Sequence, residues 1–226
     1  MKKRVIKITL LSLGVLAGIL IIASVTRMLQ WFSASTTACY PAIKPGDWVF
    51  TSNLVKPDRF SIISYYATTP EFGKEVWAHR LCGLEGDKIE IKNGDLYVNN
   101  KFADNEFPVS HVYIFPFHES EKISEVMTLD DMHTRYVSAD SMTSYLPVKT
   151  VEKLALKARR IIVPADEKNE YIYQQFGSAW NQDHFGPVIV PKGKYFVLGD
   201  NRSYSQDSRY MGFIDKSDYV ATVLGR

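Results

Sequence analysis

A tight turn rich in small residues could present a reactive side chain. Residues 36–47 read TTACYPAIKPGD, with two prolines and a Gly-Asp step. Ala38, the position at which we expect a nucleophile, carries only a methyl group. Its neighbours Thr37 and Cys39 carry a hydroxyl and a thiol, and a thiol near an imidazole ionises readily. Adjacent side chains of an extended segment point opposite ways, so we expect Cys39 to face the core.

Residues that bind metals or form cross-links are sparse. Cys39 and Cys82 are the two cysteines, and the sequence leaves open whether they form a disulfide. No Cys/His cluster has the spacing of metal ligands, because the histidines are dispersed at His79, His111, His118, His133 and His184. We therefore expect no metal and no cofactor.

The N-terminus predicts a membrane anchor. Residues 8–25 carry no charge and would span roughly 27 Å as a helix, close to the hydrocarbon thickness of a bilayer. Four basic residues precede this stretch and only Arg27 follows it closely. The positive-inside rule then places the N-terminus in the cytoplasm and the chain after about residue 28 on the far side of the inner membrane. A cleaved signal peptide is disfavoured by the length of the stretch and by the lack of a clear A-x-A site.

The rest of the chain indicates a mainly β fold. Segments rich in aromatic and β-branched residues lie at 47–54, 59–67, 75–84, 87–93, 95–102, 187–200 and 218–225. Asn93-Gly94 between two of them is a strong hairpin signal. The middle of the chain is more polar and has helix-compatible stretches at 124–137, 149–160 and 166–180.

These patterns predict four regions. The cytoplasmic tip and anchor occupy residues 1–27, and a variable insertion with helices occupies 103–184. The β-rich domain is expected in two parts, 28–102 and 185–226. The net charge of +2 gives no electrostatic reason to expect nucleic acid as a partner.

Four stretches, in order behind the anchor, together resemble the type I signal peptidase (leader peptidase) family. They are TTACYPAIKPGD (36–47), WAHRLCGLEGD (77–87), NGDLYVN (93–99) and YFVLGDNRSYSQDSRYMGF (195–213). The last is the most specific, since it matches the family pattern GDNR-x-x-S-x-DSR-x-x-G. The resemblance covers the anchor, residues 36–102 and residues 185–213. It implies a β-rich peptidase domain beside the membrane and a serine endopeptidase that removes signal peptides from exported preproteins.

The resemblance also implies roles for individual residues. The family serine lies three residues before the proline that is Pro41 here, which gives Ala38. Thr36 then takes the place of a hydroxyl that lines the oxyanion hole, together with the backbone N–H of residue 38. The base position precedes Arg80 and holds His79, where most bacterial members have lysine and the endoplasmic-reticulum type has histidine. A histidine needs less pKa tuning than a lysine to accept a proton at neutral pH.

A histidine base needs an orienting partner instead, and an acidic residue is the usual one. We expect Asp207 to orient His79 and Arg209 to hold the loop by an ion pair, while Ser205 could also hydrogen-bond the base. The competing interpretation is that Asp200, Asp207 and Arg209 only staple a turn.

Ala38 leaves four explanations open. The serine has been replaced deliberately, which gives a trap that binds substrate without turnover, or the chain is a natural inactive relative that serves as a binding or assembly factor. Alternatively Thr37 or Cys39 acts as the nucleophile, or the alignment of the motif is wrong by one residue.

Signal peptides end in small residues, so the resemblance implies shallow apolar pockets. Ile43, Trp77 and Ala78 flank the motifs and are candidates to line them, although they could equally pack inward as ordinary strand residues. The expected partners are signal peptides of exported preproteins, the lipid bilayer and components of the secretion machinery.

Overall fold

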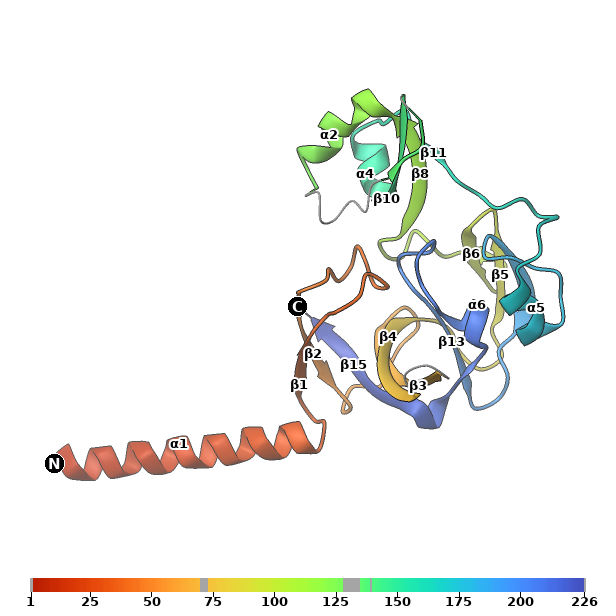
Figure 1. The fold of residues 1–226 in the computed structure, drawn as a ribbon. Coiled ribbons are helices and arrows are strands. Elements are labelled where there is room, and N and C mark those ends of the chain that lie inside the picture. Colours follow the sequence, from red (N-terminus) through yellow and green to blue (C-terminus); the bar gives the residue numbers. More distant parts are fainter. Residues whose placement is uncertain (1, 70–72, 128–134, 139, 226) are drawn as a thin grey trace.

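The computed structural model describes residues 2–69, 73–127, 135–138 and 140–225 of the chain. Its first element, α1 (Lys2–Val25), projects away from the remaining elements (Figure 1). The stretch Arg4–Val25 has a mean hydropathy of 2.5, and its most apolar window is not buried inside the protein. Among the described residues, α1 is the one helix long and apolar enough to cross a membrane.

The fold is mainly β, as the sequence predicts. The largest sheet has seven strands in the order β1-β2-β15-β3-β4-β13-β14. Neighbouring strands in it are antiparallel, and Ile63 of β3 pairs with His79 of β4. The strands of this sheet are β1 (Gln30–Ser33), β2 (Trp48–Ser52), β3 (Ile62–Thr69), β4 (Gly73–Gly83), β13 (Lys194–Leu198), β14 (Ile214–Asp215) and β15 (Tyr219–Gly225).

A second sheet has the order β12-β5-β6-β7. Its strands are β5 (Lys88–Lys92), β6 (Asp95–Val98), β7 (Lys101–Phe102) and β12 (His184–Ile189). The hairpin predicted at Asn93-Gly94 is confirmed, because Lys92 pairs with Asp95 across it. Asn93 and Gly94 have φ values of 52° and 80°, and positive φ at both central residues is what a type I′ turn requires.

The region expected as an insertion holds a small sheet of its own as well as helices. This third sheet has the order β11-β8-β10-β9 and lies above the large sheet in Figure 1. Its elements and their neighbours are β8 (Ser110–Pro116), η1 (Phe117–Glu119), α2 (Ser120–Ser124), β9 (Arg135–Tyr136), β10 (Ser141–Pro147), α4 (Val148–Lys153) and β11 (Arg159–Arg160).

The predicted helical stretches have different outcomes. The stretch 166–180 contains α5 (Glu170–Phe176), which begins after Asn169, whose side chain accepts a hydrogen bond from the Ile172 N–H. The helix predicted over 149–160 stops early, because Ala155 adopts a φ of 46° and Arg159–Arg160 pairs with β8. Residues 128–134 of the stretch 124–137 lie outside the described residues. Three short helices were not predicted: η1, α6 (Ser208–Met211) and η2 (Lys216–Asp218). The helix α2 meets the predicted stretch 124–137 only at Ser124.

An aromatic core joins the second sheet to α5. The ring of Phe185 lies 5.0 Å from that of Phe176, 5.1 Å from that of Trp180 and 5.6 Å from that of Phe196, measured between centroids. Phe185 is 1% exposed. Its neighbours therefore come from α5, the segment that follows it and β13, so one buried side chain links the end of the insertion to the large sheet.

The turn that holds Ala38 is joined to the third sheet. Tyr40 is buried in the apolar cluster of that region, which includes Phe115 and Leu146. Its backbone oxygen accepts a hydrogen bond from Oγ of Ser110, the first residue of β8, at 3.2 Å. The third sheet therefore contacts the candidate site directly.

Replacement of Phe185 should test the aromatic core. We expect Phe185→Ala to lower the free energy of unfolding by about 3–5 kcal/mol, because it removes a buried ring and leaves a cavity. Urea unfolding of the detergent-solubilised chain, followed by circular dichroism, measures the change. Phe185→Leu is the matched control and should lose clearly less, and equal losses would contradict the assignment.

Candidate active site

The structure brings the two motifs of the predicted site together. Ala38 lies half-buried in the turn between β1 and β2. The thiol of Cys39 donates a hydrogen bond to the carbonyl oxygen of Ala78 at 3.2 Å. Cys39 follows the predicted nucleophile position and Ala78 precedes His79, so the turn lies against the strand that carries the histidine.

His79 is buried inside the large sheet, with 3% of its surface exposed. Its Nδ1 lies 2.9 Å from the hydroxyl oxygen of Tyr65 on β3. Its Nε2 is buried and has no hydrogen-bond partner among the described residues. Burial lowers the pKa of His79 to about 4, helped by the positive charge of Arg209 and opposed by the negative charge of Asp207. The imidazole is therefore neutral above about pH 5.

Asp207 directs its carboxylate to the loop and not to the histidine. Its oxygens accept hydrogen bonds from Nε and Nη2 of Arg209, at 2.9 and 2.8 Å, and from the backbone N–H of Gly199 at 3.0 Å. Both side chains are buried. Among the described residues no hydrogen bond joins His79 to Asp207, the residue expected to orient it. Asp207 acts on the imidazole through its charge, while Tyr65 makes the hydrogen bond.

Ser205 packs beside residue 38. An ideal Cβ placed on Gly199 would lie 2.2 Å from Oγ of Ser205 and 2.8 Å from the carbonyl oxygen of Ala38. Only a glycine fits between these two groups. The same carbonyl accepts a hydrogen bond from the backbone N–H of Asn201 at 3.1 Å. Oγ of Ser205 is buried and has no hydrogen-bond partner among the described residues, so it makes no bond to His79 in this structure.

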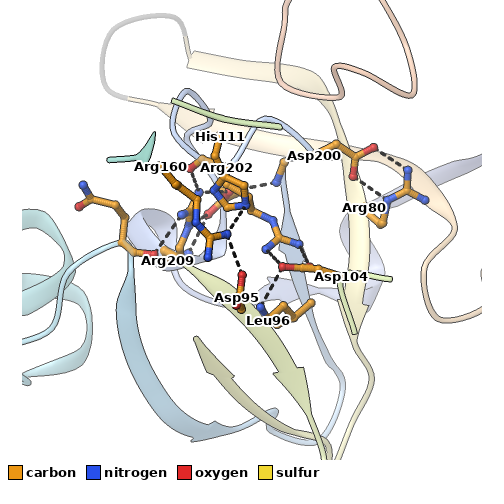
Figure 2. A network of polar contacts seen from close by, with 12 residues as sticks. Arg80, Asp95, Leu96, Asp104, His111, Arg160, Asp200, Arg202 and Arg209 are labelled. Carbon is orange, nitrogen blue, oxygen red and sulfur yellow. Dashed lines mark hydrogen bonds and ion pairs between the residues drawn. The ribbon is translucent and has the colours of Figure 1, made fainter. Parts of the chain in front are cut away.

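A buried ion pair joins β4 to the loop that carries Ser205 and Asp207. Nε and Nη2 of Arg80 donate to the two carboxylate oxygens of Asp200 at 2.6 and 2.5 Å (Figure 2). Nη1 of Arg80 donates to the carbonyl oxygen of Phe60 at 2.5 Å. Two parallel bonds fix both the distance and the angle between the groups. The pair therefore sets the position of His79, the residue before Arg80, relative to the loop.

The remaining predicted residues differ in exposure. Thr36 is exposed and Thr37 is half-buried, while Ile43 is 6% exposed in an apolar cluster with Cys39. Trp77 and Ala78 are half-buried. Ile43 thus packs in the core, and a role in lining a substrate pocket stays a prediction for all three candidates.

The cysteines are free and buried. Burial raises the pKa of the Cys39 thiol far above its usual range and that of Cys82 to about 12. Because the thiolate is the reactive form of cysteine, the protonated Cys39 is poorly suited to replace the serine.

A cluster of possible metal ligands lies in the network of polar contacts drawn in Figure 2. Single ligand atoms of Asp95, Asp104 and His111 lie within 4.8 Å of one another. Arg160 donates to Asp95 at 2.7 Å and lies 3.2 Å from Nε2 of His111, and Arg202 pairs with both oxygens of Asp104 (Figure 2). These arginines already neutralise the carboxylates, so the contacts are explained by ion pairs.

Tyr65 is the residue of the site that the sequence did not reveal. It was expected in a strand, but its role depends on the pairing of β3 with β4, which places Tyr65 opposite Trp77 and two residues from the partner of His79. A tyrosine within a predicted strand is common, so its presence in the sequence gives no sign of this role. The antiparallel pairing of the two strands is the signal that could have identified it.

Stability should fall in acid because of His79. The pKa of His79 is about 6.5 when unfolded and about 4 when folded, so the unfolded chain binds more protons between these values. Its contribution, about 3 kcal/mol, is present above pH 6.5 and is lost as the pH falls toward 4. Urea unfolding of the wild type and of His79→Gln is measured from pH 7.5 to 4. The difference between their free energies of unfolding isolates the contribution of His79. A difference that does not change with pH would contradict it.

The buried ion pair should be sensitive to the loss of one partner. Asp200→Asn leaves the guanidinium of Arg80 buried without its counter-charge, which we expect to lower the free energy of unfolding by about 3–5 kcal/mol. The control, Asp215→Asn, breaks the pair of Asp215 with Lys194, whose side chains are 52% and 33% exposed. It should change the free energy of unfolding by less than about 1 kcal/mol. Both are measured by urea unfolding, and similar losses would show that the buried pair has no special role.

Comparisons with known proteins identify the family of the chain. The family described as "Signal peptidase, peptidase S26" matches residues 5–225. "Signal peptidase I" of Buchnera aphidicola subsp. Baizongia pistaciae is 28% identical over 235 residues, covering 91% of this chain and 72% of that protein. "Signal peptidase IB" of Staphylococcus aureus strain Mu50 is 25% identical over 221 residues, covering 88% and 89%.

Among solved structures, the crystal structure of a signal peptidase I from Enterococcus faecalis V583 is similar at 23% identity with a TM-score of 0.35, covering 74% of this chain and 97% of that one. The family match spans nearly the whole chain, including α1, the turn at Ala38, His79 and the loop of Asp200 and Asp207. The chain therefore belongs to the signal peptidase family, peptidase S26.

Proposed function

We propose that this chain is anchored in the cytoplasmic membrane by α1 and binds the signal peptides of exported preproteins without hydrolysing them. The family supports the substrate class, because the relatives named above are signal peptidases. The basic residues before the apolar part of α1 support a cytoplasmic N-terminus and an extracytoplasmic β-rich domain.

The observation that carries the lack of hydrolysis is the methyl group of Ala38. A methyl group cannot attack a carbonyl, and loss of a serine nucleophile lowers the rate by a factor on the order of 10⁶. Ser205 packs beside the position, and the neighbouring Cys39 contacts Ala78, the residue before His79. These contacts support a site that resembles that of a peptidase but lacks the attacking atom, as in a substrate trap or an assembly factor.

A second function is signal peptidase I-type endopeptidase activity through a relocated nucleophile. The neighbours of Ala38 favour it, because Thr37 has a hydroxyl and is half-buried one residue away. Cys39 is the weaker candidate, since its thiol is buried and donates to Ala78. In this function His79 would serve as the general base and the exposed Thr36 would help to stabilise the oxyanion.

Binding and cleavage of one preprotein separate the two functions. We expect the detergent-solubilised full chain to bind a fluorescent preprotein saturably in an anisotropy titration, and the same preprotein without its signal peptide to bind much more weakly. Mass spectrometry of the mixture should show no cleavage at the signal-peptide junction. Cleavage that Thr37→Ala or Cys39→Ala abolishes would establish the second function, and equal binding of both preproteins would refute the first.

A further inference from the structure

The hydrogen bond between Tyr65 and His79 decides which imidazole nitrogen carries the proton. Tyr65 is fully buried, and its hydroxyl makes one hydrogen bond among the described residues, to Nδ1 of His79 at 2.9 Å. Nε2 of His79 has no partner there. The ring is neutral, so it carries one N–H, and burial raises the pKa of Tyr65 so that the phenol keeps its proton.

Two arrangements of these protons are possible. In the first, the Tyr65 hydroxyl donates to Nδ1, the proton of His79 sits on Nε2, and the unsatisfied groups are this N–H and the spare lone pairs of the hydroxyl. In the second, Nδ1–H donates to the hydroxyl oxygen, which leaves both the O–H and the Nε2 lone pair buried without partners. Each arrangement leaves one buried donor without an acceptor, so the strength of the hydrogen bond decides between them. The phenolic O–H is a stronger donor than the N–H of a neutral imidazole, and the imidazole lone pair is a stronger acceptor than the phenolic oxygen, so the first arrangement is favoured.

We infer that Tyr65 is a positioning residue that holds His79 in the tautomer with its proton on Nε2. In this tautomer Nε2 carries an N–H that can only donate a hydrogen bond, and it has no lone pair to offer. A serine dyad needs the opposite, because the nitrogen that faces the hydroxyl must take up its proton while Nδ1 keeps its own. Nδ1 is already occupied by Tyr65, so Nε2 is the nitrogen left for residue 38.

The site would therefore differ from a working dyad in two ways. It lacks the hydroxyl at residue 38, and its imidazole is protonated on the wrong nitrogen. Asp207 does not correct this, because its oxygens bind Arg209 and Gly199 instead of Nδ1. This inference deepens the proposed function, on which it rests, because it gives a second reason why bound signal peptides are not hydrolysed.

Nuclear magnetic resonance reads the tautomer without any catalysis. Long-range ¹H–¹⁵N correlation on the solubilised full chain labelled at histidine distinguishes a protonated from an unprotonated ring nitrogen, and His79→Gln assigns the signals. At pH 7 we expect the proton of His79 on Nε2, and in Tyr65→Phe a shift of the population toward Nδ1–H. Tyr66→Phe, on the same strand but hydrogen-bonded to Arg27, is the matched control and should leave the tautomer unchanged.

A proton on Nδ1 in the wild type would overturn the inference, whatever the variants do. An unchanged tautomer in folded Tyr65→Phe would also overturn the role of Tyr65. This readout is independent of the proposed function. Cleavage of preprotein by the wild type would refute that function, while the resonance measurement would still decide which nitrogen carries the proton.

Restoring the hydroxyl gives a second test. We expect Ala38→Ser alone to cleave preprotein slowly, and Ala38→Ser combined with Tyr65→Phe to cleave about 10-fold faster, because relief of about 1.4 kcal/mol in the tautomer equilibrium corresponds to that factor. Ala38→Ser combined with Tyr66→Phe should match Ala38→Ser. A single variant that is as fast as the double variant would overturn the inference, and if neither cleaves, the resonance measurement decides.

Discussion

The bidentate ion pair between Arg80 and Asp200 fixes the geometry on which the rest of the site depends. It joins β4, which carries His79, to the loop that carries Ser205 and Asp207. Taking two charges out of water is unfavourable, and the geometry compensates for it only when every donor and oxygen is satisfied. Here each of the three guanidinium nitrogens of Arg80 has a partner, because Nη1 donates to the Phe60 carbonyl. The end of β4 and the loop are thus held in a fixed relative position by groups that tolerate little displacement.

The same principle recurs twice in the loop. Arg202 pairs with Asp104, and Arg209 pairs with Asp207, in each case with both partners buried. The GDNR-x-x-S-x-DSR pattern that makes the family recognisable is therefore in large part a set of buried charges and their counter-charges. These residues are as much structural as chemical, and their presence alone does not show that a site is active.

Much of the fold could be read from the sequence, because it depends on local patterns. The N-terminal helix follows from an uncharged, mostly apolar stretch, and the hairpin at Asn93-Gly94 follows from the positive φ that these residues tolerate. The early end of α4 could not be predicted, since Ala155 adopts a conformation that its residue type does not favour. Within the site, motif spacing identified His79 and the loop. The sequence predicted Asp207 as the residue that orients the imidazole, whereas Tyr65 makes the hydrogen bond to it. That contact depends on the pairing of β3 with β4, which the motifs do not show.

Tyr40 gives the third sheet an influence beyond its own region. Its ring belongs to the core under β8 and β10, and its backbone lies two residues from Ala38. A change of side-chain volume in that core would shift the turn that holds Ala38. The third sheet is therefore linked by packing to the turn that holds Ala38. A substitution in this core can therefore act on the turn from a distance while every motif residue stays the same.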